Sequence, residues 1–131
     1  EAARPQIMLL MHTFVAEDEA EAEQLARDLS LFFCQFAAWF QNKKPVHQGI
    51  LEPLTEDEVA AMPQYAPDLI RQKLVIGTAE EVIARLKAYE ALGYDQYSIW
   101  IDSGLPHERK KKSLQLFIDR VLPVFGEGRA S

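Results

Sequence analysis

The chain has 131 residues, 48% of them hydrophobic, which is enough for one compact domain. It is too short for a complete (β/α)₈ barrel, which needs roughly 250 residues. With 14 basic and 20 acidic residues the net charge is −6, which argues against nucleic acid or an anionic membrane as partner, because both select basic surfaces. A lone cysteine, Cys34, predicts an unreactive buried thiol and a reducing, cytoplasmic location.

The first third of the chain predicts a strand followed by a long helix. Residues 7–15 are almost continuously apolar, which is typical of a strand covered on both faces in a parallel sheet. Asp18, with Glu21 three residues later, predicts a helix start, and a helix fits residues 19–40. One broad apolar stripe runs along it, formed by Leu25, Leu29, Phe32, Phe33, Phe36 and Phe40.

The pattern loosens over residues 41–72, where prolines and a glycine leave room only for short helices. Thr55 marks one plausible helix start. An irregular stretch of this length inside a compact domain is more often a lid or binding loop than a plain connection. We therefore expect this segment to be a lid.

Regular elements return after residue 72. The expected elements are a strand at 73–77, a helix begun by Thr78 and ended near Gly93, a strand at 96–101 and a helix from Pro106 to about Pro123. Glu81 completes a capping box with Thr78, and Arg85 is spaced to pair with Glu81 on the same helix.

This element order predicts an α/β fold with right-handed crossovers and parallel strands. Three strands cannot close a barrel. We therefore expect residues 1–131 to form a single unit with amphipathic helices on one side of the sheet. The uncovered face would then be buried against further strands of a longer chain, or against another copy in a homo-oligomer.

Four short motifs, in this order and spacing, resemble the C-terminal end of the luciferase-like flavin-dependent monooxygenases, which include bacterial luciferase and alkanesulfonate monooxygenase. They are Val-Ile-Gly-Thr-Ala-Glu-Glu-Val at 75–82, Tyr-Glu-Ala-Leu-Gly-Tyr-Asp at 89–95, Ser-Gly-Leu-Pro-His-Glu at 103–108 and Val-Leu-Pro-Val-Phe at 121–125. The resemblance implies the last three βα units of a TIM (β/α)₈ barrel, here an incomplete one.

The same resemblance implies the chemistry. Members of the family bind reduced flavin mononucleotide (FMN), or a deazaflavin in some branches, and many react it with dioxygen to oxidise a small organic substrate. Most flavin contacts would come from strands that this chain lacks, so the chain is expected to be inactive alone.

Two histidines are candidate catalytic residues. His12 is either a buried structural histidine or an inward-facing acid/base or flavin-orienting group; the alkanesulfonate branch carries a similar histidine, but with an arginine where this chain has Leu10. His107 lies in a first helical turn at the expected catalytic rim, or is simply exposed. Ser103, Gly104 and Leu105 precede it, and we expect them to line the substrate pocket.

Gly77 and Thr78 form a strand-to-helix turn whose free N–H groups could bind a flavin phosphate. Thr78 and Glu81 already satisfy two of these donors, which favours plain helix capping. Neither metal-ligand spacing nor a phosphate-binding glycine loop occurs, so we expect no metal.

Two functions remain open from the sequence. The first is a part of a flavin-dependent monooxygenase that binds flavin and a small molecule. The second is a non-catalytic module that self-associates through an exposed sheet face. The long segment 41–72 and the two histidines favour the enzyme.

Overall fold

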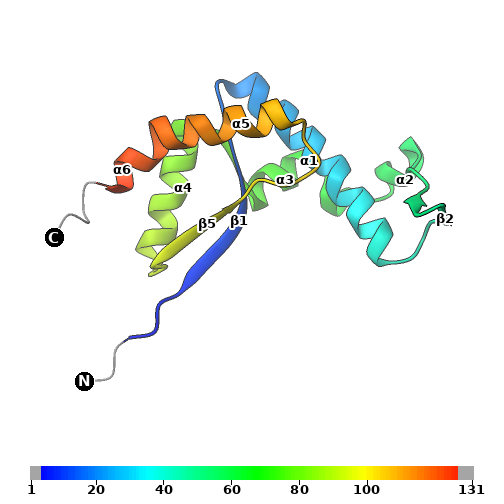
Figure 1. The fold of residues 1–131 in the computed structure, drawn as a ribbon, viewed down its shortest axis with the longest axis horizontal. Helices are drawn as coiled ribbons and strands as arrows, with labels where there is room; N and C mark the ends of the chain where they lie inside the picture. The colour runs from blue at the N-terminus through cyan, green and yellow to red at the C-terminus, as the bar shows by residue number, and fades with distance from the viewer. Residues whose placement is uncertain (1–3, 127–131) are drawn as a thin grey trace.

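The computed structural model describes residues 4–126, which form a parallel three-stranded sheet packed with helices (Figure 1). The strands are β1 (Met8–Ala16), β4 (Val75–Thr78) and β5 (Gln96–Trp100), in the order β4-β1-β5. Both neighbours run parallel to β1. The predicted parallel α/β class is confirmed.

The two halves of β1 have different partners. Met8 to His12 pair with β5, with His12 opposite Trp100, the last residue of that strand. Thr13 to Ala16 pair with β4. The carboxyl end of β5 therefore lies level with the middle of β1.

The long helix α1 (Glu19–Phe40) has the bounds that the sequence predicts. Its N-cap Asp18 accepts a hydrogen bond from the Glu21 N–H at 2.8 Å. The Glu21 carboxylate accepts from the Glu17 N–H, one residue before the cap, at 2.7 Å. Side chains thus satisfy one free N–H group of the helix start and the N–H of the residue before its cap.

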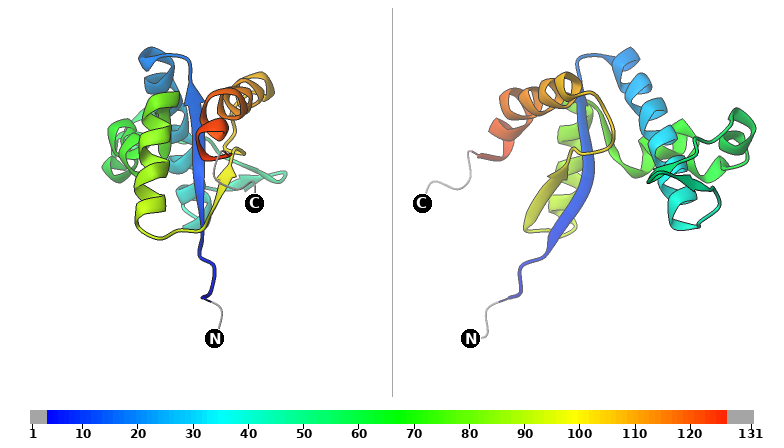
Figure 2. Two further views of the ribbon diagram at one scale, coloured as in Figure 1. Left: turned by 90° about the vertical axis from the view of Figure 1, so that its left-hand side faces the viewer. Right: turned by 45° about the vertical axis from the view of Figure 1, so that its right-hand side comes forward.

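Residues 41–72 form short elements that begin beyond the far end of α1 and return alongside it to the sheet (Figure 2). They are the hairpin strands β2 (Val46–His47) and β3 (Ile50–Leu51), the helices α2 (Glu56–Ala60) and α3 (Pro67–Lys73), and the 3₁₀ turn η1 (Pro63–Tyr65). The short helices were predicted, and Thr55 does cap α2. The hairpin was not; its turn uses Gln48 and Gly49 at positive φ, as tight hairpin turns require.

The remaining helices are α4 (Ala79–Ala91), α5 (His107–Leu116) and α6 (Leu122–Gly126). Gly93, at φ +96°, follows α4 as predicted. The last helix does not stop near Pro123. It runs on through the π-helical turn η2 (Phe117–Val121), in which the Leu122 N–H donates to the Phe117 carbonyl. The wider turn precedes Pro123, which has no N–H to continue the regular ladder.

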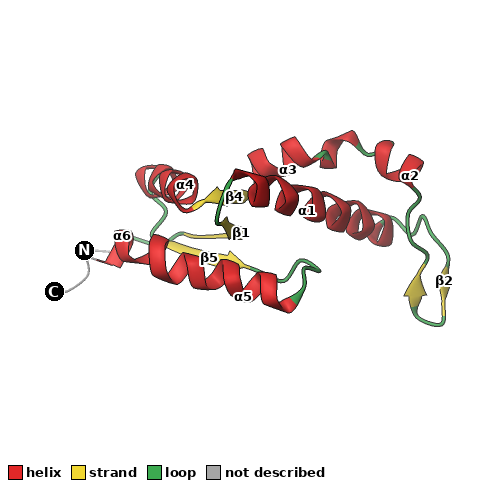
Figure 3. Ribbon diagram, turned by 90° about the horizontal axis from the view of Figure 1, so that it is seen from above, coloured by secondary structure: helices red, strands yellow, loops and turns green. Residues whose placement is uncertain are grey.

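The prediction that helices lie on one side of the sheet is wrong. One core cluster joins Phe14 and Ile76 to α1 and α3. A second joins Val15 and Val75, which point to the opposite face, to α4 and η2. Viewed from above, α4 lies on one side of β4 and β1, and α1 with α3 on the other (Figure 3).

The strand order explains this arrangement. The crossover from β1 to β4 moves one way along the sheet, and the crossover from β4 to β5 moves back past β1. Right-handed crossovers that move in opposite directions place their helices on opposite faces. Three consecutive barrel strands would instead be neighbours in sequence order, with the second strand in the middle.

Part of the α1 face remains open. The lower half of β1 extends past α1, and Met8, Leu10 and Trp100 are about half exposed there. Leu10 and Trp100 share the face of Phe14, since side chains alternate along a strand and Trp100 pairs with His12. The covered and open parts of this face meet at His12.

Candidate active site

His12 lies in the middle of β1 with its ring enclosed by aromatic side chains. Its imidazole stacks on Trp100 at a centroid distance of 4.5 Å and an angle of 17°. Phe33 of α1 meets it edge-on at 5.1 Å, and Phe32 lies at 6.3 Å. The residue is only 9% exposed. Burial lowers the pKa of His12 below its ordinary value of 6.5, so the ring is neutral at pH 7.

Ser103 supplies the polar contact to this ring. Its Oγ lies 2.8 Å from His12 Nδ1, and the serine is 1% exposed. The two residues are 91 positions apart and meet because the chain leaves β5 next to the middle of β1. The structure thus brings together one of the predicted catalytic histidines and one predicted pocket residue.

Of the other two predicted pocket residues, Gly104 lies at the surface and Leu105 in the core. Gly104 has φ +75°, a conformation that favours glycine, and a Cβ there would lie 3.4 Å from the Phe32 ring. Leu105 packs in the core cluster with Phe14. Leu105 therefore anchors the segment after β5 to the core. Its role as a wall of the substrate pocket remains a prediction.

His107, the second predicted catalytic residue, begins α5 and is exposed. Among residues 4–126, no hydrogen bond, ion pair or ring contact joins it to His12. The structure does not bring the two histidines into one contact network. A catalytic role for His107 remains a prediction.

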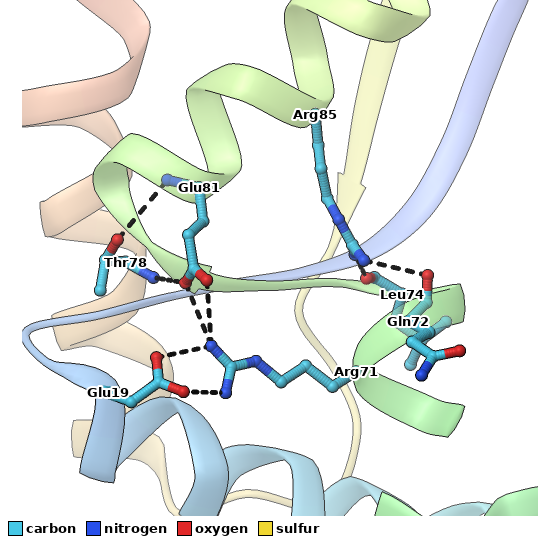
Figure 4. Close-up of polar contacts among 7 residues, drawn as sticks. All are labelled: Glu19, Arg71, Gln72, Leu74, Thr78, Glu81 and Arg85. Carbon is cyan, nitrogen blue, oxygen red and sulfur yellow. Dashed lines mark hydrogen bonds and ion pairs between the residues drawn. The ribbon is translucent and has the colours of Figure 1, made fainter. Parts of the chain in front are cut away.

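Gly77 and Thr78 form the predicted capping turn (Figure 4). The Thr78 N–H donates to the Glu81 carboxylate at 2.9 Å, and the Glu81 N–H donates to Thr78 Oγ1 at 3.5 Å. A Cβ on Gly77 would overlap the Glu81 carboxylate, which explains the glycine. An acidic side chain already occupies the position that a flavin phosphate would need.

Arg71 of α3 reinforces this turn. Its guanidinium pairs with Glu19 at the start of α1 and lies 3.1 Å from Glu81 (Figure 4). These carboxylates hold the pKa of Arg71 above its ordinary value. The predicted pairing of Arg85 with Glu81 is wrong: Arg85 donates instead to the carbonyls of Gln72 and Leu74 at the end of α3. Hydrogen bonds from Arg85 to these carbonyls take the place of the expected ion pair within the helix.

A cavity of about 660 Å³ lies elsewhere, between α4, β5 and the last helices. Tyr89, Tyr97, Phe117 and Phe125 contribute to its walls. None of the predicted site residues lines it. It faces the opposite side of the sheet from His12, so it is not part of the candidate site.

Other site chemistries find no support in residues 4–126. That range holds no group of three or more His, Cys, Asp or Glu side chains able to bind a metal ion. Within it, every helix is too short or too polar to span a bilayer. Cys34 is buried as predicted, and burial raises the pKa of its thiol, which disfavours the reactive thiolate.

Sequence reasoning missed the aromatic enclosure of His12. Trp100 fell within the expected strand at 96–101 without a role of its own, and Phe32 and Phe33 were assigned only to the apolar stripe of the helix at 19–40. The signal that could have found Trp100 is its place as the last residue of a strand, where barrel and open-sheet enzymes hold functional groups.

These features describe an α/β chain in which a neutral, aromatic-enclosed histidine lies level with the carboxyl end of a neighbouring parallel strand. The model of the luciferase-like monooxygenase family matches residues 1–96. The oxygenase component of flavin-dependent trigonelline monooxygenase from Acinetobacter baylyi (strain ATCC 33305 / BD413 / ADP1) is 51% identical over 126 residues. That alignment covers 96% of this chain and 35% of the relative.

The chain belongs to the luciferase-like monooxygenase family, as the sequence motifs had indicated. It spans about a third of the length of the curated relative that it matches.

Proposed function

We propose that the chain is part of the oxygenase component of a flavin-dependent monooxygenase that oxidises a small organic molecule with reduced flavin and dioxygen. The observation that carries this proposal is the 51% identity, over nearly the whole chain, to an oxygenase component of that kind. Identity at this level supports a shared cofactor class. Trigonelline, the substrate in that relative's name, is the first compound to test.

The described residues suit one part of a flavin. Trp100 and Leu10 present exposed apolar surface next to His12, which suits one face of a flat aromatic ring. Gly77 and Thr78 do not suit the phosphate, because Glu81 occupies that turn. We therefore propose that the phosphate of FMN, or of a deazaflavin, binds to residues outside this chain.

Within such a site, bound reduced flavin supplies the electrons that activate dioxygen. The residues of this chain orient ligands and exclude water. His12 offers a polar group in an otherwise apolar wall, Trp100 and Phe33 hold its ring, and Ser103 fixes its rotation. We place His107 at the rim, with the substrate entering past Gly104.

The wider architecture is also a proposal. Further strands of a TIM barrel in the intact protein would enclose the open face around Leu10 and Trp100 together with the ligand beside it. A barrel in sequence order would place β4 between β1 and β5 and would separate Trp100 from His12, whereas β1 lies between β4 and β5 here. Backbone contacts between Ile76 and Ile99 in the intact protein, measured by NMR, would support that order and contradict the site described above.

One partner and one moving segment also follow from the proposal. An oxygenase component needs a source of reduced flavin, which we assign to a separate reductase component in the cytoplasm. We also propose that residues 41–72 act as a lid, since they form short elements that begin beyond the end of α1 and are tied to the sheet mainly through α3.

The test is a binding titration of the intact protein with oxidised and reduced FMN and with a deazaflavin, followed by assay of trigonelline oxidation with a reductase. Saturable binding of one flavin supports the proposal. Failure to bind any flavin would refute it. Light scattering on the same sample tests the alternative, a self-association module, which predicts oligomers without flavin binding.

A further inference from the structure

We propose that Ser103 is a positioning residue that holds His12 as the neutral tautomer with its proton on Nε2. His12 would then act as a hydrogen-bond donor and not as a general base. The location of this donor in a flavin site rests on the function proposed above. The tautomer itself rests only on the contacts described below.

The proton of the Ser103 hydroxyl needs an acceptor. Ser103 is 1% exposed, and its Oγ makes one hydrogen-bonding contact among residues 4–126, to His12 Nδ1 at 2.8 Å. A buried hydroxyl donates its proton to an acceptor wherever one is in reach. The acceptor in reach is Nδ1, which must then be unprotonated.

The reverse bond is disfavoured. If Nδ1–H donated to Ser103 Oγ, the hydroxyl proton would lie in the interior without an acceptor, and a buried unpaired donor carries the full cost of desolvation. A neutral imidazole has one N–H. With Nδ1 unprotonated, that proton is on Nε2.

The surroundings of the His12 ring favour its uncharged form. Trp100 stacks on it, Phe33 meets it edge-on, and no acidic side chain contacts it among the described residues. An imidazolium would find no counter-ion in these surroundings, and it would have to donate from Nδ1 and reverse the Ser103 bond. Burial lowers the pKa of His12 in the same direction.

The second ring nitrogen of His12, Nε2, has no partner in a described hydrogen bond. Within residues 4–126, every fully buried side-chain nitrogen or oxygen has a hydrogen-bond partner. His12 makes its one side-chain hydrogen bond through Nδ1. Nε2 is therefore not fully buried and keeps some contact with solvent. A ligand there would meet an N–H donor suited to a carbonyl or anionic oxygen.

The experiment uses the intact protein labelled with ¹⁵N-histidine. In the wild type at pH 7 we expect a pyridine-type resonance from Nδ1 and a pyrrole-type resonance from Nε2. In Ser103→Ala we expect the Nε2–H to Nδ1–H ratio to fall about two- to ten-fold, the worth of one hydrogen bond. The rate of substrate oxidation should fall in proportion to the fraction of molecules that keep the Nε2–H donor, which is a smaller factor than the change in the ratio.

Ser113→Ala is the matched control. Ser113 is also buried, and its Oγ accepts from the Val15 N–H on β1 at 2.8 Å, three residues from His12. This variant should keep the wild-type tautomer and rate. Ser103→Cys keeps the shape with a weaker donor, should fall between wild type and alanine, and replaces the alanine variant if that fails to fold.

A protonated Nδ1 in the wild type would overturn the proposal, and so would an unchanged tautomer ratio in Ser103→Ala. Equal losses of rate in Ser103→Ala and Ser113→Ala would reduce Ser103 to a structural residue. If the resonances are as expected but no flavin binds, the proposed function fails while the assigned tautomer stands.

Discussion

Replacement of Thr78 decides whether the Gly77–Thr78 turn caps a helix or binds a phosphate. Thr78→Ala removes the hydroxyl that accepts from the Glu81 N–H. Loss of a threonine N-cap costs about 0.5–2 kcal/mol. The bond here is 3.5 Å long and the Glu81 carboxylate keeps its partner on the Thr78 N–H, so we expect the lower end, about 0.5–1 kcal/mol.

The two roles differ in flavin affinity. A cap predicts a lower free energy of unfolding in urea and a flavin Kd unchanged within about two-fold. A hydroxyl bound to a charged phosphate contributes about 1.5–3 kcal/mol, so its loss would weaken flavin binding roughly ten- to 150-fold. Thr78→Ser, which keeps the hydroxyl, is the control. A large rise in Kd for Thr78→Ala alone would refute the capping interpretation.

Three further outcomes are expected. Because burial lowers the pKa of His12 from 6.5, the unfolded chain takes up a proton first as the pH falls, and the wild type loses stability below about pH 6.5. The variant His12→Gln should lack this loss in urea titrations. An equal loss in the variant would contradict the burial of His12. Burial raises the pKa of Tyr97 from 10.0 to about 12. The free energy of unfolding should therefore fall as the pH rises above about 10, where only the unfolded tyrosine ionises. The variant Tyr97→Phe should show a smaller fall with pH in the same titration. Leu29→Ala, at a fully buried position, should cost about 2–5 kcal/mol, against less than about 0.5 kcal/mol for the exposed Leu92→Ala; similar losses in the two denaturation curves would refute the assigned core.

The elements that the sequence predicted correctly depend on local chemistry. The bounds of α1 follow from Asp18 and an uninterrupted apolar stripe, and the starts of α2 and α4 follow from Thr55 and Thr78 with a glutamate three residues on. These signals lie within one helical turn of the feature that they define.

The features that were missed depend on pairing across the fold. The strand order puts β1 between its later partners, and no local pattern in the sequence shows this. From that order follow the helices on both faces. The pairing of Arg71 with both Glu19 and Glu81 likewise joins residues as many as 52 positions apart. The His12–Ser103 contact spans 91.

The position of His12 on β1 reconciles two requirements that normally conflict. A histidine that is to stay neutral and in one orientation needs burial against rigid neighbours, and a histidine that is to meet a ligand needs an open nitrogen. Above His12, Phe14 is fully covered by α1; below it, Leu10 is about half exposed. Because β1 changes partner at Thr13, from β5 to β4, packing is dense on one side of His12 and open on the other. The change of partner in the middle of one strand thus produces the site. A substitution that shifted the register of β1 by one residue would turn His12 to the α4 face and would abolish the site.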